Sequence, residues 1–390
     1  MNYIKVKDVT DFVRNGANIK QDKQCTSGIP ITRIETISNS QFNWNKFGYA
    51  NITDDKYKEY YLKDKDVLLS HINSAKFLGR SVLFEQKNTH PIIHGMNLLC
   101  LRFRQEEYMP SFFVWYSKSQ IANNYFAENT KKAVNQASIT SSAIKEMPIP
   151  DITLGNQQKI AAELDTIQSA IDNKKQQLSL LDEAVKSEFV EMFGDPVLDT
   201  GNPFSECFEL NPKKTEKQNW SDDLEISFLP MSCVSECGDV DTSIIKHYSE
   251  VKKGFTYFRD NDVLFAKITP CMENGKGGIA TKLRNGIGFG STEFHVLRPI
   301  NLISNSYWIY YLTTFKSFRK YAEKKMTGSA GQKRVPVSFF DNIYVNLPPI
   351  DLQNQFAAFV QQIDKSKFVV KQQIADLQEL LDSKMQEYFS

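Results

Sequence analysis

Several short strings in this 390-residue sequence resemble catalytic or cofactor-binding motifs, but each lacks a part that the chemistry needs. Adenine methylation uses an Asn-Pro-Pro-aromatic tetrapeptide or its acidic counterpart, and the nearest strings, at 202–204 and 347–350, do not match it. Gly286–Gly290 resembles a glycine-rich cofactor loop without a following helix, and Gly328–Arg334 resembles a phosphate loop without Gly-Lys-Ser/Thr. The sequence therefore predicts no methyltransferase or nucleotide-binding site.

Acidic and thiol pairs lead to the same expectation. Two Asp-x-Asp strings, at 64–66 and 260–262, could supply nuclease carboxylates, but each opens an apolar strand, as turn-forming aspartates do, and no Glu-x-Lys follows closely. Cys233 and Cys237 lack the second ligand pair of a zinc site. We therefore expect neither a catalytic residue nor a bound metal.

The segment from Lys316 to Arg334 has the residue types that hold phosphate groups. It contains seven Lys or Arg residues and one acidic residue, Glu323, a balance of +6 (7 − 1). The small residues at 327–332 add hydroxyl and backbone N–H donors suited to anions. A poorer equivalent begins at Lys131 in the first half. The alternative interpretation of such a segment is a solvated helix face.

The sequence contains an internal repeat, described below, in which residues 196 positions apart correspond to one another. Two such pairs differ in residue type: His71 with Lys267, and Asn73 with Thr269. Variation between copies of one scaffold suggests that the copies read different targets. The full set of candidate nucleic-acid-binding residues is Arg33, His71, Asn73, Arg80, Lys131, Lys132, Gln136, Lys267, Thr269, Lys276, Lys325, Thr327, Gly328, Ser329, Gln332, Lys333 and Arg334.

Composition limits the class of protein. The chain is 41% hydrophobic and 12% aromatic, which is typical of globular proteins, and its length favours two to three domains. Lys plus Arg exceed Asp plus Glu by one (47 − 46), so a polyanionic partner must be met by a local patch. The N-terminus resembles no secretory signal, the six cysteines are predicted to be reduced thiols, and 301–315 is too short and polar to span a bilayer. We expect an intracellular protein.

An internal repeat organises the chain. The Asp-x-Asp turn and apolar strand at 63–69 recur at 259–265, and further matches keep this same displacement of 196 (259 − 63), called the repeat offset below. Near the end of each half we expect the register to slip by two residues, because Ile149-Pro150 matches Leu347-Pro348. Each half is predicted to be an α+β domain of mixed strand and helix, followed by a proline-led long helix.

The two long helices have apolar residues spaced alternately three and four apart, which is a heptad seam. Residues 157–193 would extend about 55 Å as a helix, which favours a spacer over an ordinary core helix. Lys174 and Lys367 each occupy a seam position that is apolar in the other copy and can set the register. Residue spacing leaves antiparallel and parallel pairing open. The predicted seam residues are Ile160, Leu164, Ile167, Ile171, Leu178, Leu181, Val185, Phe356, Val360, Ile363, Val370, Ile374, Leu377 and Leu381.

Five features in this order resemble the specificity (S) subunit of type I restriction-modification systems, and the resemblance covers the chain from end to end. They are the opening Gly28–Arg33, the Asp-x-Asp-Val-Leu strand, Thr327–Ala330 followed by Gln332, the proline-led Leu347–Gln355, and Met192–Pro196. The resemblance implies an antiparallel pair of helices. It also implies four regions: target recognition domain 1 at 1–152, helical spacer 1 at 153–195, target recognition domain 2 at 196–350 and helical spacer 2 at 351–390.

The same resemblance implies a function in host defence and DNA methylation that is not catalytic in this chain. The two recognition domains would bind the halves of a split, asymmetric sequence in double-stranded DNA. The helices would dock methyltransferase (M) subunits, two in number, and through them restriction (R) subunits. S-adenosylmethionine, ATP and Mg²⁺ are then expected in the partner subunits, and no membrane is expected. Ala133-Val134-Asn135 departs from the family's Gly-Ser-Ala in the first half.

Three alternatives remain at this point. A coiled-coil scaffold that binds proteins rather than DNA would have the same repeats and helices. A self-contained enzyme that methylates or cuts DNA is disfavoured by the missing motifs. A specificity subunit of a related restriction architecture differs only in its partners.

Overall fold

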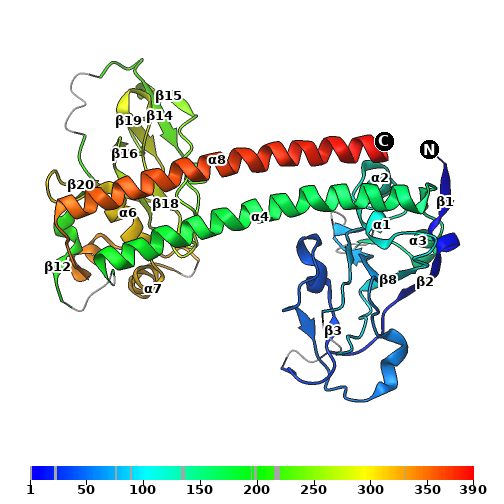
Figure 1. Cartoon of the computed structure of the whole chain (residues 1–390). Helices are drawn as coiled ribbons and strands as arrows, with labels where there is room; N and C mark the ends of the chain where they lie inside the picture. The colour runs from blue at the N-terminus through cyan, green and yellow to red at the C-terminus, as the bar shows by residue number, and fades with distance from the viewer. Residues whose placement is uncertain are drawn as a thin grey trace. The chain divides into compact units, whose positions relative to one another are not determined.

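The computed structural model describes residues 2–21, 24–74, 77–87, 90–132, 137–194, 196, 200–214, 220–329 and 331–390. They form two compact units (Figure 1). Unit 1 comprises Met1–Lys175 and Gln372–Ser390, and unit 2 comprises Gln176–Lys371. Each unit combines sheets, short helices and parts of two long helices, which confirms the α+β class. The four predicted regions stay a prediction, because each unit takes residues from both long helices.

A four-stranded antiparallel sheet in the order β2-β8-β5-β7 forms the centre of unit 1. All four residues of β5 are buried. Because side chains alternate across a strand, Val67 and Leu69 pack with α1, whereas Leu68 joins a second cluster. The elements of this unit are β1 (Tyr3–Lys5), β2 (Thr10–Asn15), β3 (Ile31–Thr32), β4 (Phe47–Gly48), β5 (Val67–Ser70), β6 (Ile72–Asn73), β7 (Ser81–Leu83), β8 (Leu98–Phe103), α1 (Pro110–Tyr116), α2 (Gln120–Glu128), β9 (Lys131–Lys132), β10 (Ala137–Ser138), α3 (Ser141–Lys145) and β11 (Pro148–Pro150).

Unit 2 has an equivalent sheet in the order β13-β20-β17-β18 and a second sheet in the order β15-β14-β19-β16. The second sheet contains the parallel pair β14 and β19. The elements of unit 2 are β12 (Asn202–Pro203), β13 (Phe208–Leu210), β14 (Glu225–Leu229), β15 (Ile245–His247), α5 (Tyr248–Val251), β16 (Thr256–Arg259), β17 (Val263–Ala266), β18 (Gly277–Ile279), β19 (Ile287–Gly290), β20 (Phe294–Pro299), α6 (Ser306–Thr314), α7 (Lys316–Lys325) and β21 (Tyr344–Val345).

The structure confirms the repeat and corrects one detail. Strands β5 and β17, β7 and β18, and β8 and β20 begin at positions that differ by the repeat offset, and so do the long helices α4 (Leu154–Phe193) and α8 (Ile350–Phe389). The expected two-residue slip before these helices is wrong. Ile149 pairs with Ile4 and Val345 with Asn202, so the displacement is 196 (345 − 149) at the later strand and 198 (202 − 4) at the first one. Between these paired residues unit 1 is therefore two residues longer than unit 2 (149 − 4 = 145 against 345 − 202 = 143), and the difference arises before β5 and β17, which already differ by 196.

A buried glutamine near the start of each long helix ties it to a short helix of the same unit. Gln157 Oε1 accepts from the backbone N–H of Met109, at 2.7 Å, and Gln353 Oε1 accepts from that of Asn305, at 2.8 Å. Both donors occupy the N-cap position, where a helix leaves N–H groups unpaired. Each glutamine therefore fixes the direction in which its long helix leaves the sheet.

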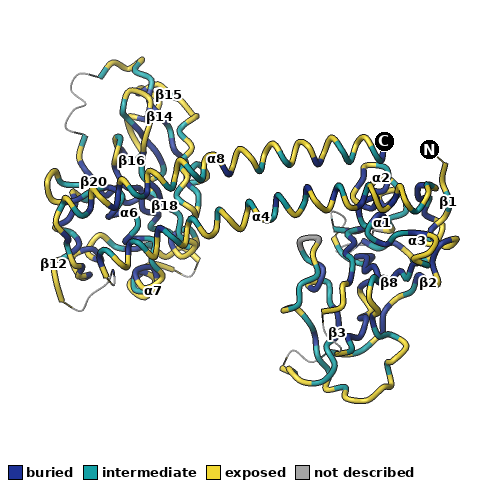
Figure 2. The backbone as a smooth tube through the Cα atoms, viewed as in Figure 1, coloured by how far each residue is buried: buried dark blue, intermediate teal, exposed yellow. Residues whose placement is uncertain are grey.

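The long helices pair in opposite directions within each unit, and most of the seam residues belong to the main apolar cluster of their unit. Figure 2 shows buried and exposed stretches alternating along both helices. In unit 2, Phe189 packs on Phe356, and Asp182 binds Lys367 at 2.5 Å, so the α8 number falls as the α4 number rises. In unit 1, Glu163 binds Lys384. Each predicted seam residue is buried or half-buried. The contacts between the two helices select the antiparallel alternative. No helix in the described ranges is long and apolar enough to cross a membrane.

Candidate nucleic-acid interface

An aspartate–arginine pair occupies the same place in each unit. In unit 2, Asp262 accepts from Nε and Nη2 of Arg298 at 2.8 Å, and both residues are buried. Asp66 and Arg102 form the same pair in unit 1, at the repeat offset. Burial alone would lower the pKa of Arg298, but its bonds to Asp262 raise it. These aspartates are therefore structural, as the turn interpretation predicted. Among the described residues no three His, Cys, Asp or Glu side chains are placed to hold a metal.

A short hairpin carries most of the candidate residues of unit 2. Thr327 and Arg334 pair across it, Arg334 also pairs with Ile268, and the backbone N–H of Thr269 donates to Lys333 O at 3.0 Å. The end of β17 and the hairpin, far apart in the sequence, thus lie side by side. The exposed candidates here are Lys325, Thr327, Gly328, Ser329, Gln332 and Lys333.

Unit 1 has the same hairpin with other side chains. Lys131 pairs with Ser138, and Ala137 pairs with Asn73, at positions that precede the pairs of unit 2 by the repeat offset. Lys131 is exposed, whereas the side chain of Lys132 and all of Gln136 lie outside the described residues. The backbone pairing of the hairpin with the neighbouring strand end, called the frame below, is therefore repeated, while its charged side chains are not.

Arg334 is already held by the protein. Its Nε and Nη2 donate to the Glu293 carboxylate, with Nε–Oε2 at 2.9 Å and Nη2–Oε1 at 2.8 Å, and its Nη1 donates to Gln332 O. The bonds to Glu293 raise the pKa of Arg334. This arginine fastens the hairpin to the residue before β20, which leaves Lys333 as the hairpin cation that faces solvent. No signal in the sequence pointed to Glu293, because its corresponding residue is Asn97.

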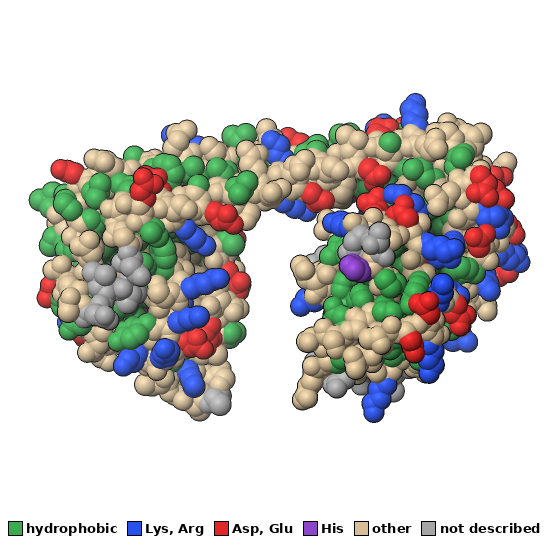
Figure 3. Space-filling view, turned by 60° about the horizontal axis from the view of Figure 1, so that its bottom comes forward, with side chains coloured by type: hydrophobic (Ala, Val, Ile, Leu, Met, Phe, Trp, Pro, Cys, Tyr) green, Lys and Arg blue, Asp and Glu red, His purple; other side chains and the backbone are tan. Residues whose placement is uncertain are grey.

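Helix α7 carries a row of exposed lysines that the candidate set omitted. Lys316, Lys320 and Lys324 follow one another at i+4 spacing, and each is exposed. Like charges at this spacing destabilise a helix, so a row of three indicates a surface suited to a polyanion. None of them forms an ion pair with a residue in the described part of the chain. Figure 3 shows Lys and Arg side chains gathered on a face of unit 2.

The remaining arginine of the basic segment has a different task. Arg319 is buried and donates to the backbone carbonyls of Thr313, Met272 and Gly275. Burial lowers its pKa to about 10. It fixes the turn before β18 and contributes no charge to the surface. Of the seven basic residues in the segment, the five lysines are exposed (7 − 2, without Arg319 and Arg334).

The corresponding surface of unit 1 is uncharged or acidic. Gln120, Asn124 and Glu128 occupy the positions of the three lysines of α7, and Gln120 donates to Asn124 at 2.7 Å. Exposed positive charge on these two corresponding helices is therefore concentrated in unit 2.

The other candidates of unit 1 are scattered. His71 is buried, with Nδ1 at 3.2 Å from Ile139 O and Nε2 at 3.3 Å from Met96 O, and burial lowers its pKa. Asn73 is half-buried beside Ser70. Such a histidine is inaccessible to a ligand unless the strand end moves.

Two arginines and one lysine lie apart from the hairpins. Arg33 lines a cavity of about 320 Å³ with Gln21 and Asn97. The guanidinium of Arg80 lies 4.2 Å from the centre of the Phe77 ring. In unit 2, Lys276 is half-buried and donates to a backbone carbonyl at 3.4 Å.

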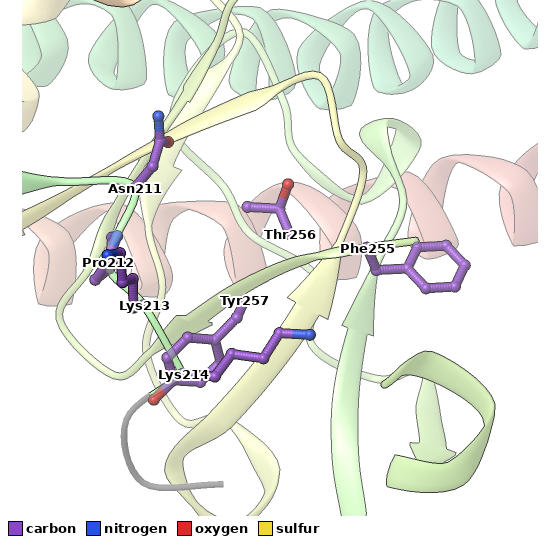
Figure 4. A pocket seen from close by; sticks show the side chains of 7 residues that line it. All are labelled: Asn211, Pro212, Lys213, Lys214, Phe255, Thr256 and Tyr257. Carbon is purple, nitrogen blue, oxygen red and sulfur yellow. The ribbon is translucent and has the colours of Figure 1, made fainter. Parts of the chain in front are cut away.

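A further cavity of unit 2, of about 650 Å³, was not expected from the sequence (Figure 4). Lys214 lies there, 4.7 Å from the centre of the Phe289 ring, and donates to a backbone carbonyl. The signal that could have found it is the lysine pair after β13. The lining residues are Asn211, Pro212, Lys213, Lys214, Phe255, Thr256 and Tyr257.

Each unit also has a cleft beside its long helices, of about 580 Å³ in unit 2 and about 470 Å³ in unit 1. Phe368 on the rim in unit 2 is 72% exposed and Val369, next to it, is 53% exposed. The two clefts use corresponding positions, since Gln41, Trp44, Leu83, Trp115 and Gln168 line the first, and their counterparts at the repeat offset, Cys237, Val240, Ile279, Tyr311 and Asp364, line the second.

Removing the charge of Lys333 tests whether the hairpin contacts phosphate. We expect Lys333→Ala to weaken binding to all DNA sequences and to lower the slope of log K against log salt by about 0.9, because one phosphate contact is lost. Fluorescence anisotropy of labelled DNA titrated with the full chain, over a salt series, measures this slope. Lys365→Ala, an exposed lysine of α8, is the control. An unchanged slope with an altered base preference would contradict the expectation.

Comparison with known proteins shows the same repeat. The model of the type I restriction modification DNA specificity domain matches residues 1–183 and again residues 205–379. These ranges correspond to the two halves of the repeat and include most of both long helices.

Three curated proteins are similar in sequence. The EcoAI specificity subunit of Escherichia coli is 47% identical over 150 residues, 38% of this chain and 25% of that protein. The EcoEI specificity subunit of the same species is 46% identical over 146 residues, 37% of this chain and 24% of that protein. The matched part thus spans about a quarter of these two relatives. The putative MjaX specificity subunit of Methanocaldococcus jannaschii is 28% identical over 379 residues, 92% of this chain and 86% of that protein.

Two solved structures share the fold. The S subunit of a type I restriction-modification system from M. genitalium superposes with a TM-score of 0.53 at 12% identity, covering 100% of this chain and 96% of that one. A chain from a structure concerned with complex assembly and conformational transition of the type I R-M system gives 0.52 at 14% identity, covering 100% and 97%.

Proposed function

The chain belongs to the type I restriction modification DNA specificity family, and we propose that it is the DNA specificity subunit of a type I restriction-modification complex. Each unit binds one half of a split, asymmetric site in double-stranded DNA. Exposed lysines position the unit on phosphates, and side chains at the strand ends read base edges in the major groove. Two weak readers joined in one chain gain affinity through effective concentration and demand a fixed separation of the half-sites.

One observation carries this proposal: the same frame occurs twice with different exposed chemistry. The aspartate–arginine pair and the paired hairpin both recur at the repeat offset, so the scaffold is one design. On that scaffold Ser138 stands where unit 2 has Arg334, and Gln120 stands where it has Lys316. A scaffold for one kind of protein partner would have no need of this difference, whereas an asymmetric DNA sequence requires it.

The duplicated cleft supports two methyltransferase subunits, one at each unit. Corresponding positions line both clefts, so a partner that fits one meets a similar shape at the other. The exposed Phe368 and Val369 supply apolar area that a soluble partner can cover. Restriction subunits would join through the methyltransferases rather than through this chain.

In this proposal the chemistry belongs to the partners. S-adenosylmethionine, ATP and Mg²⁺ would bind the methyltransferase and restriction subunits, and this chain would be a non-catalytic recognition subunit. It would act in the prokaryotic cytoplasm, where its DNA target is found. What supports this is the structural use of the aspartates that could have served a nuclease, Asp66 and Asp262, both of which hold arginines.

The test is methylation in cells. The chain is expressed with its genomically adjacent methyltransferase, and the modified bases of the whole genome are sequenced. We expect one split motif with a fixed spacer. The control is the methyltransferase expressed alone, which should modify no such motif. A stable pair that modifies no sequence would count against DNA recognition, and failure to form a pair would favour the scaffold alternative.

A further inference from the structure

Three corresponding positions meet in each unit and differ in all three residues, although the frame around them is the same. In unit 2 they are Lys267, Glu293 and Arg334; in unit 1 they are His71, Asn97 and Ser138, each at the repeat offset. The backbone holds Lys267 and His71 in the same way, since Val335 N donates to Lys267 O and Ile139 N donates to His71 O, both at 2.9 Å. The strands that follow Asn97 and Glu293 also keep the same register. The trio therefore varies on a fixed frame.

In unit 2 the trio contains one cation, Lys267, that forms no ion pair with the other described residues. Both carboxylate oxygens of Glu293 accept hydrogen bonds from Arg334, and Nη1 of Arg334 donates to Gln332 O. Lys267 is half-buried, and its ammonium makes no hydrogen bond or ion pair with a residue that the structure describes. Burial lowers the pKa of Lys267, the Glu293 charge opposes this and the Arg334 charge reinforces it. The backbone of Lys267 is held on both sides, by Glu293 O and by the N–H of Val335, while its ammonium lacks an acceptor among the described residues.

Resting on the proposed function, we propose that Lys267 reads guanine in the half-site bound by unit 2, and that Glu293 with Arg334 positions it without neutralising it. The amine is attached at the end of β17, beside the exposed hairpin of Lys333, so both reach the same stretch of duplex.

The chemistry of the bases favours guanine. An ammonium group offers three donors and no acceptor. In the major groove guanine presents two adjacent acceptors, N7 and O6, whereas adenine adds an amino donor beside N7 and cytosine presents an amino donor. A lysine with no acceptor of its own gains most from the base with two. In unit 1 this reader is absent, because both ring nitrogens of His71 face backbone carbonyls.

The experiment uses the complex of this chain with its methyltransferase and a DNA library randomised in both half-sites. Two variants are compared with the unaltered protein: Lys267→Met, which keeps the aliphatic stem, and Lys267→Gln, whose amide matches adenine rather than guanine. We expect the preference for guanine at one position of one half-site to fall by roughly 5- to 150-fold in the first. In the second the preference should move to adenine, which a misfolded protein cannot produce. The matched control is Lys320→Ala, which removes an exposed lysine of α7. It should lower the salt slope without changing the preferred base at any position.

The outcomes separate the assignment from the function on which it rests. If the unaltered complex prefers a split sequence and both Lys267 variants keep the same preference, the assignment is wrong and the proposed function stands. A lower salt slope with unchanged preference would also overturn it, because Lys267 would then contact phosphate. A complex with no sequence preference at all would overturn the proposed function, and the assignment with it.

Discussion

Inserting one heptad into both long helices, after Lys175 and after Lys371, is expected to abolish binding at the original spacing of the half-sites. Seven residues add about 10 Å of helix, or the length of about three base pairs. Three base pairs also turn the duplex by about 100°, because one turn takes about 10.5 base pairs. A heptad keeps the seam in phase, so the antiparallel pairing survives. Each unit then has to find its half-site alone, and affinity should fall by about 100-fold or more.

Selection from a library of two half-sites with variable spacers measures this effect. Some longer spacer can restore binding if the grooves come back into position. The control insertion goes into α4 alone, where it shifts the contacts of Asp182 and Phe189 with α8 and should also destabilise the chain. An unaltered spacer bound at full affinity after the double insertion would show that the helices do not set the separation.

Replacing Arg298 by methionine should cost unit 2 about 3–5 kcal/mol, because it leaves the carboxylate of Asp262 buried without its partner. The side chain of Asp262 is 1% exposed and that of Arg298 is 8% exposed, so water cannot replace the lost bonds. Only the backbone N–H of Arg259 still donates to it among the described residues. Hydrogen exchange of the β17 and β20 amides measures the stability of this unit by itself.

A variant that removes an exposed ion pair separates the cost of a buried, unpaired carboxylate from the loss of an ion pair as such. Arg284→Met is the control: its pair with Glu225 is exposed and should contribute at most about 1 kcal/mol. Equal losses in both variants would contradict this account.

For the basic segment, the sequence established the number of basic residues, whereas the structure showed which of their side chains face solvent. The sequence showed seven basic residues, and their number alone predicted a phosphate-binding surface. It could not show that Arg319 turns inward onto backbone carbonyls or that Arg334 is held by Glu293. Both facts depend on residues far away along the chain, and residue spacing within one segment carries no information about them.

What the sequence determined by itself are the features that depend on local periodicity and on repetition. The repeat offset, the two heptad seams and the turn role of the Asp-x-Asp strings all follow from spacing, because helix and strand periods are properties of short segments. Tertiary structure alone decided that the helices run antiparallel, where the two-residue shift between the halves lies, and which cations face solvent. These depend on contacts between distant segments, such as Asp182 with Lys367 and Glu293 with Arg334, and such contacts form only when the chain packs.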